Sequence, residues 1–155
     1  VYGPWGRPDM ALFKFTKNIL EDKEIDVYNN GNHSRDFTYV DDIVEGIYLS
    51  SISKKELIDS NFDSKDPSRS FCKSIIFNLG RGKPENLEDF IDEIENNLGK
   101  RAKRNLMPLQ PGDVPDTSAD ISGLKDFSGY EPKTSIKIGV KNFIDWYKEY
   151  YKVNL

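Results

Sequence analysis

Apolar residues recur at helical spacing along much of the chain, and their pattern predicts five helices. The clearest covers 87–98, where Asn86 is a candidate N-cap and Gly99 tolerates the left-handed conformation at a helix end. The last helix begins at Ser135 and carries an apolar stripe almost to the carboxyl end. The other three are predicted from Asp9 to about Glu21, from about Ile43 to Ser51, and from Asp120 through Phe127.

Short runs of β-branched and aromatic residues between these helices predict four strands. They cover Ile25–Tyr28, Arg35–Val40, Ser74–Leu79 and Arg104–Met107. Asp41 and Asp42 follow the second run, and we expect them to cap the next helix. Because helices and short strands are mixed, the fold class is α/β or α+β. The polar stretch 53–73 is expected to form a surface loop.

Composition narrows the class of protein. The 155 residues suit about one domain, and the net charge of −4 does not predict a basic surface for nucleic acid. The longest purely apolar run, Ile75-Ile76-Phe77, is far too short to cross a bilayer, so no membrane partner is expected. Cys72 is the only cysteine, which is typical of a reducing compartment such as the cytoplasm.

Common catalytic signatures are missing from the sequence. It contains neither a glycine-rich dinucleotide fingerprint nor a phosphate-binding loop. The single histidine, His33, lies at a turn without evident catalytic or metal-binding partners. We therefore expect no chemical role for it and predict no metal site.

Two loop regions nevertheless carry residue types that suit a ligand. Arg35 follows a turn at the start of a predicted strand, where its planar guanidinium could bind a phosphate or diphosphate. The alternative is a surface arginine paired with its neighbour Asp36. The segment 108–115 contains three prolines and presents Gln110 and Asp113 as polar tips. A rigid loop of this kind suits ligand recognition, although it could equally be a plain connection.

Five segments in order resemble motifs of one enzyme family. Residues 1–10, Val-Tyr-Gly-Pro-Trp-Gly-Arg-Pro-Asp-Met, resemble a signature of UDP-glucuronate 4-epimerases, which belong to the extended short-chain dehydrogenase/reductase superfamily. Similar motifs of that superfamily are matched by 35–42, 77–80, 110–114 and 143–147. The resemblance covers nearly the whole chain except 53–73. It implies the α/β, Rossmann-type fold of that superfamily, with this chain as the C-terminal nucleotide-sugar-binding lobe, residues 1–155.

The resemblance also implies a reaction and a set of binding residues. In the family, NAD takes hydride from C4 of a UDP-sugar and returns it to the other face of a 4-keto intermediate. Arg35 is then expected at the diphosphate, Tyr28 and the Val27 backbone near the uracil, and Arg7 near the sugar or its carboxylate. Further residues expected in the UDP pocket are Asn78, Gln110 and Asp113. Tyr2 and Pro4 are expected near the nicotinamide of NAD, provided that an N-terminal domain is present.

The catalytic half of such an enzyme is missing from the sequence. No tyrosine is followed four residues later by lysine, so the family's Tyr-x-x-x-Lys base is absent, and with it the NAD-binding loop. We therefore expect no catalytic residue here, no NAD binding by this chain alone, and an N-terminal NAD-binding domain outside it. The alternatives are an inactive UDP-sugar-binding module, a gene remnant, or part of a related dehydratase or decarboxylase. An N-terminal half or a second copy is the expected protein partner.

Overall fold

The computed structural model describes residues 1–54 and 74–153. Most of the predicted surface loop 53–73 lies outside these ranges. The chain forms α1 (Ala11–Leu20), β1 (Glu24–Val27), the 3-10 turn η1 (Tyr28–Gly31), β2 (Ser34–Arg35) and α2 (Val40–Ile52). It continues with β3 (Glu85–Asn86), α3 (Leu87–Leu98), β4 (Lys103–Leu106), α4 (Ser122–Ser128) and α5 (Ile136–Tyr151).

The strands pair in two small sheets. β1 runs parallel to β4, with Ile25 opposite Arg104, while β2 runs antiparallel to β3, with Ser34 opposite Asn86. Ile25 and Val27 are fully buried, because alternate residues of β1 face the helices. The mixture of helices and short strands follows the sequence pattern.

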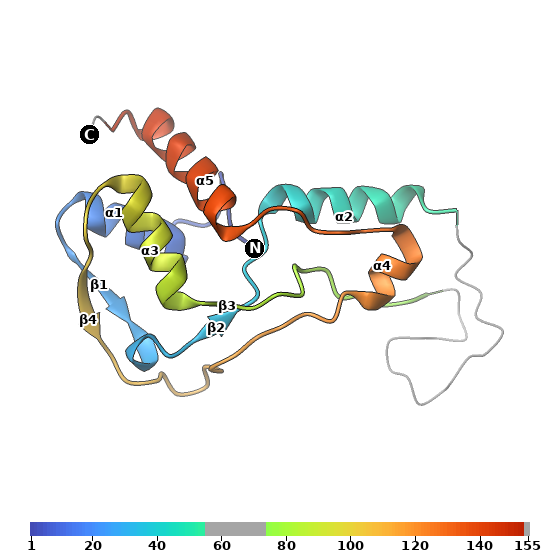
Figure 1. Ribbon diagram of the computed structural model, residues 1–155, viewed down its shortest axis with the longest axis horizontal. Helices are drawn as coiled ribbons and strands as arrows, with labels where there is room; N and C mark the ends of the chain where they lie inside the picture. The colour runs from blue at the N-terminus through green and yellow to red at the C-terminus, as the bar shows by residue number, and fades with distance from the viewer. Residues whose placement is uncertain (55–73, 154–155) are drawn as a thin grey trace.

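The main core lies where three helices cover β1, at the end of the molecule opposite α4 (Figure 1). α3 packs against both α1 and α5. The fully buried residues at its centre are Ile25, Val27, Phe90, Ile91, Ile94, Val140, Phe143 and Ile144. The amphipathic faces predicted for 87–98 and for the last helix meet here, since each must cover its apolar stripe. Gly99 takes the predicted left-handed conformation, with φ 66°.

A smaller group of residues joins α2 to α4. The Tyr130 ring lies against Gly46 of α2, where an added Cβ would lie 2.9 Å from the ring and 2.5 Å from Leu79. Burial raises the pKa of Tyr130 to about 12, and its hydroxyl donates to the carbonyl of Gly80 at 2.9 Å. A residue without a side chain at position 46 therefore lets the helix approach this tyrosine.

Five local predictions differ from the structure, and three of them concern residues 34–42. The strand predicted over 35–40 does not form, because β2 covers only Ser34 and Arg35, and α2 begins at Val40, three residues earlier than expected. Asp42 does not cap its own helix: it is buried in the first turn and accepts the N–H groups of Lys133 and Thr134 and the Thr134 hydroxyl. This carboxylate holds the segment before α5, a contact that local sequence does not reveal.

The other two differences also concern segments whose partners are distant in sequence. Residues 74–79 form no regular strand in the part of the chain that the structure describes. Asn86 occupies the N-cap position of α3 as predicted, but its side chain makes no capping hydrogen bond. By contrast, the Ser135 hydroxyl accepts from the Ile138 N–H and caps α5 as predicted. No helix of the described residues is long and apolar enough to cross a membrane.

Candidate functional site

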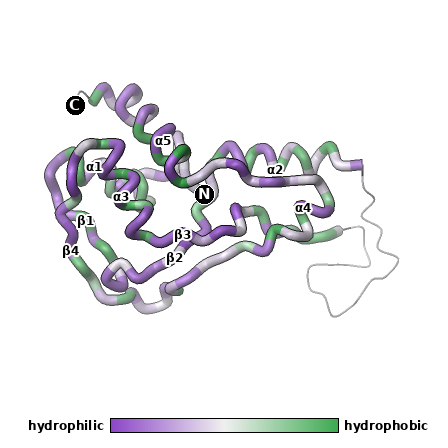
Figure 2. The backbone as a smooth tube through the Cα atoms, in the orientation of Figure 1, coloured by the Kyte–Doolittle hydropathy of each residue, from purple (hydrophilic) through white to green (hydrophobic). Residues whose placement is uncertain are grey.

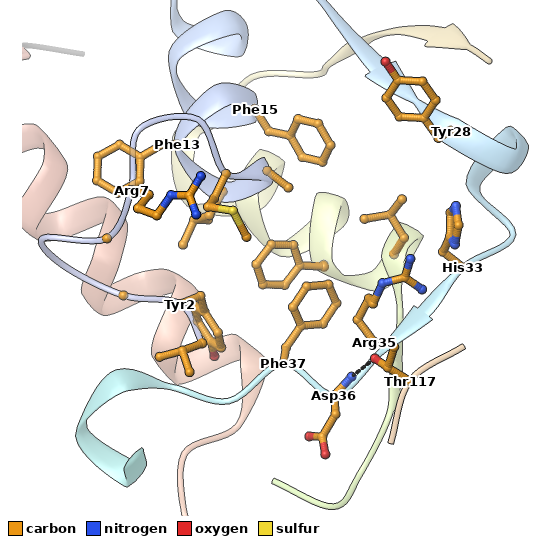
Figure 3. A pocket seen from close by; sticks show the side chains of 18 of the residues that line it. Tyr2, Arg7, Phe13, Phe15, Tyr28, His33, Arg35, Asp36, Phe37 and Thr117 are labelled. Atoms are coloured by element: carbon orange, nitrogen blue, oxygen red, sulfur yellow. Dashed lines mark hydrogen bonds between the residues drawn. The ribbon is translucent and has the colours of Figure 1, made fainter. Parts of the chain in front are cut away.

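A cavity of about 410 Å³ opens where the N-terminal segment, α1, β1 and β2 meet. One part of its wall is apolar and includes Phe13, Phe15 and Phe37. Figure 3 shows Arg7 on one side of this space and His33 and Arg35 on the other. Its volume is in the range of small-molecule sites, in which a few polar groups fix a ligand against an apolar wall.

The polar wall contains a closed network that joins β2 to the loop 108–118. One Arg35 nitrogen donates to the Pro115 carbonyl at 2.6 Å, and the other donates to Asp113 Oδ1 at 3.0 Å. His33 Nδ1 lies 3.2 Å from the same Pro115 carbonyl, and His33 Nε2 lies 3.7 Å from Asp113 Oδ2. Arg35 is therefore held by a proline-rich loop about 80 residues away, and its guanidinium remains partly exposed.

Asp36 does not pair with Arg35, which was the alternative to a ligand-binding role. Its carboxylate accepts three backbone N–H groups, from Arg81, Gly82 and Ala119, at 2.9–3.1 Å. Its own N–H donates to the Thr117 hydroxyl, which Figure 3 marks with a dashed line. Asp36 thus ties β2 to two loops and leaves Arg35 directed at the cavity.

Two further predicted residues lie at the rim of the cavity. Arg7 is largely exposed and pairs with Asp9 at 2.5 Å, so its guanidinium can leave this surface ion pair at low cost. Tyr28 is half-buried in the first residue of η1, next to the end of β1. Asn29 and Asn30 adopt positive φ values of 51° in the turn behind it, a conformation that asparagine tolerates.

Tyr2 lines the cavity with its ring, but its hydroxyl is buried without a hydrogen-bond partner. The hydroxyl lies against Gly139 of α5, and burial raises the pKa of Tyr2. The ring packs edge-on against Phe37, Tyr39 and Phe90. In this arrangement the Tyr2 hydroxyl cannot donate to a cofactor.

The nine residues predicted to bind substrate or cofactor divide into two groups. Those that line the cavity are Tyr2, Arg7, Tyr28, Arg35 and Asp113. Those that do not are Pro4, Val27, Asn78 and Gln110. The Val27 carbonyl accepts the Met107 N–H, and the Asn78 amide donates to the Asp120 carbonyl. Gln110 is exposed on the loop, where its carbonyl accepts the Asp113 N–H.

Sequence reasoning missed His33, which lines the cavity although its side chain is 4% exposed. It also missed Asp26 and Thr117, which belong to the same wall. Nothing in local sequence marks these residues, because β1, the turn and the 108–118 loop come together only in the folded chain. No group of metal-binding side chains is found among the residues that the structure describes.

The fold matches part of the fold of solved NAD-dependent epimerases. A family model for the NAD dependent epimerase/dehydratase family matches residues 1–60. The chain is 53% identical to Protein CapI of Staphylococcus aureus and 42% identical to UDP-glucuronate 4-epimerase 2 of Arabidopsis thaliana. Both alignments cover 98% of this chain, and they cover 46% and 35% of those relatives.

A solved relative shares this arrangement of elements. UDP-glucuronic acid 4-epimerase from Bacillus cereus, in complex with UDP-glucuronic acid and NAD, matches with a TM-score of 0.80 and 32% identity. The match covers 97% of this chain and 43% of that one. Over almost its whole length the chain is similar to NAD-dependent epimerases, and UDP-glucuronate 4-epimerases are among these relatives. The predicted α/β class is confirmed, and the chain spans less than half the length of the curated relatives it matches.

NAD is the cofactor of the solved relatives, as predicted for the family. The two residues predicted near the nicotinamide present no polar group to the cavity. The Tyr2 hydroxyl is turned into the core, and Pro4 does not line the cavity. The sequence also lacks the glycine-rich loop that binds a dinucleotide diphosphate.

Proposed function

We propose that this chain is the UDP-sugar-binding part of a NAD-dependent UDP-sugar 4-epimerase that interconverts UDP-glucuronate and UDP-galacturonate. The observation that carries the proposal is the joining of Arg35 to Asp113 at the wall of a cavity of about 410 Å³. These two residues come from separate motifs of the resemblance and are 78 positions apart. Their contact in the folded chain supports a common site.

The proposed roles follow from chemistry and position. Arg35 binds the diphosphate, because a guanidinium fork matches two phosphate oxygens. The Tyr28 ring lies at the uracil, and Arg7 approaches the sugar carboxylate across the aromatic wall. Anchoring the nucleotide suits an epimerase, since a sugar that must present both faces to a cofactor cannot itself be held tightly. Binding energy then comes from groups remote from the reacting carbon.

We assign the catalytic base and the cofactor site to a partner and not to this chain. The sequence has no Tyr-x-x-x-Lys, so we propose that an N-terminal NAD-binding half supplies the base and the cofactor site. A catalytically inactive UDP-sugar-binding module is the second candidate, because the cavity is complete in a chain without these motifs. A cytoplasmic setting for either protein stays a prediction.

The exposed face of α2 supports a protein partner. Four large apolar residues lie on this face at helical spacing, each more than half exposed: Val44, Ile47, Tyr48 and Ile52. Apolar positions along this helix are visible in Figure 2. Clustered apolar surface of this kind is typical of an interface. We propose that the N-terminal half covers it, since the two relatives named above are about two to three times as long as this chain.

Calorimetry of the chain with UDP tests the binding proposal. We expect saturable heat with UDP and with UDP-glucuronate, and weaker binding with uridine, which lacks the diphosphate. No heat at millimolar UDP would contradict a nucleotide site and leave a remnant without ligand function.

A mixing experiment separates the two candidate functions. The chain is combined with a separately produced N-terminal half and NAD, and UDP-galacturonate formation from UDP-glucuronate is measured. Turnover that requires both parts supports the split enzyme, whereas UDP binding without turnover in any mixture favours the binding module. Ile47→Glu on α2 should prevent assembly while leaving UDP affinity unchanged. Sedimentation distinguishes a complex with the N-terminal half from a dimer of this chain.

A further inference from the structure

His33 is a buried imidazole in the wall of the cavity, and its two nitrogens have different surroundings. The Pro115 carbonyl, 3.2 Å from Nδ1, can only accept a hydrogen bond, so Nδ1 carries a proton. Nε2 is buried and has no hydrogen-bond partner. It faces Asp113 Oδ2 at 3.7 Å. In the neutral ring, a lone pair therefore points toward a carboxylate, which is an unfavourable contact.

A proton on Nε2 would turn this contact into an attraction. His33 would then become a cation whose N–H groups are directed at Pro115 and Asp113. The opposite oxygen of Asp113 is already bound by Arg35 at 3.0 Å. The carboxylate thus lies between one permanent cation and one group that can become a cation.

The charge of the cavity makes this second cation significant. Two arginines against three aspartates leave the lining side chains with a formal charge of −1 when His33 is neutral. The diphosphate of a UDP-sugar carries two further negative charges. Moreover, when Arg35 directs its fork to the phosphates, the Asp113 carboxylate keeps the Val114 N–H but loses its positive neighbour, and its charge would then repel the ligand.

The other carboxylates around this network have partners of their own. Asp26 is bound by Asn105, Asp36 by three backbone N–H groups, Glu85 by Arg81, Glu88 by Arg104 and Asp116 by Ser34. Asp113 is the carboxylate that the structure places against His33 Nε2. Any response of His33 to the ligand is therefore expected to act through Asp113.

We propose that His33 is a positioning residue of the nucleotide-sugar site: it takes up a proton from solvent as the diphosphate binds and holds Asp113 while Arg35 turns to the phosphates. The inference rests on the proposed function, because it requires that a UDP-sugar binds in this cavity. Binding and protonation then favour each other. UDP-sugar affinity is highest at the acidic side of the range in which histidines titrate, and it falls as the pH rises through that range.

The first test needs no ligand. His33 is the only histidine of the chain, so the imidazole signals in a ¹H–¹⁵N spectrum belong to it without assignment. We expect the neutral ring to carry its proton on Nδ1. Asp113→Asn removes the charge that faces Nε2, so the Nε2 signal of the neutral ring should shift in this variant. An unchanged Nε2 signal would overturn the coupling between the two residues.

The second test uses UDP-glucose, whose diphosphate is esterified at both ends and keeps its charge between pH 6 and 8. Titration calorimetry at pH 7 in two buffers of different ionisation enthalpy measures proton uptake directly in the unaltered chain. We expect net uptake of a fraction of a proton and an affinity that falls by up to about tenfold per pH unit. His33→Gln keeps a polar side chain without a titrating charge, and its affinity should not change with pH.

The outcomes separate this inference from the proposed function. Binding of UDP-glucose without proton uptake overturns the role of His33 and leaves the nucleotide site standing. Proton uptake that persists in His33→Gln also overturns it, because another group would then be responsible. No binding of millimolar UDP-glucose to the folded chain overturns the proposed function and the inference with it.

Discussion

Replacement of Arg35 by alanine is the most direct test of the site. The side chain donates to the Pro115 carbonyl and to Asp113, and in the proposed complex the same fork reaches the diphosphate. A hydrogen bond to a charged group contributes about 1.5–3 kcal/mol, so UDP affinity should fall by about 10- to 150-fold. The change also leaves the Asp113 carboxylate without its cation next to the phosphates, which places the expected loss toward the upper end.

Two further variants separate the contributions to the expected loss of UDP affinity. Arg35→Lys keeps the charge but loses the planar fork, so it should lie between the wild-type protein and the alanine variant. Arg35→Ala combined with Asp113→Ala should recover part of the affinity, because the repelling carboxylate is gone. Lys125→Ala is the matched control: it removes one positive charge from α4, where Lys125 pairs with Glu131 and does not line the cavity.

The assay is calorimetric titration with UDP, accompanied by urea unfolding of each variant. Unfolding is needed because Arg35 also holds the 108–118 loop, and a lost fold would imitate lost binding. If Arg35→Ala remains folded and binds UDP as tightly as Lys125→Ala does, Arg35 does not contact the diphosphate. The site would then have to be sought elsewhere on the chain.

Four other predictions concern stability. Asp42→Asn should lower the free energy of unfolding by about 2–3 kcal/mol in urea titrations, since three donors lose a charged acceptor; an unchanged midpoint would contradict this role. Tyr2→Phe should leave stability equal or raise it by about 1 kcal/mol, because it removes a buried hydroxyl without a partner. Gly139→Ala should lower stability by about 1–3 kcal/mol, because the added methyl group would collide with the Tyr2 hydroxyl. Equal stability of Gly139→Ala and Tyr2→Phe would refute this close contact between Gly139 and Tyr2. Burial raises the pKa of Tyr2, and that of Tyr130 to about 12, so the unfolded chain ionises first and stability should fall as the pH rises from about 10 toward 12. A flat profile in urea unfolding between pH 8 and 11.5 would count against burial of these hydroxyls.

The sequence predicted the helices more accurately than the strands or the site. The apolar stripe of 87–98 and the glycine after it set both ends of α3, and Ser135 marked the start of α5, because periodicity and capping are properties of neighbouring residues. Motif resemblance also indicated the family, together with five residues that line the cavity. Periodicity, capping residues and motifs depend on residues that are near one another in the sequence, so they can be recognised before the fold is known.

Tertiary structure decided the strands and the site. Residues 35–40 were predicted to form one strand, but Asp36 turns to accept N–H groups from two distant loops, and the regular strand ends at Arg35. Arg35 contacts Asp113, which is 78 residues away in the sequence. This contact places Arg35 at the cavity, whereas the sequence alone also allowed a pair between Arg35 and its neighbour Asp36. His33 gained its significance in the same way, since burial beside Asp113 depends on how the loop 108–118 folds back over β2. The sequence determines which charged and polar side chains are present. The partners of these side chains are decided only when segments that are distant in sequence meet in the folded chain.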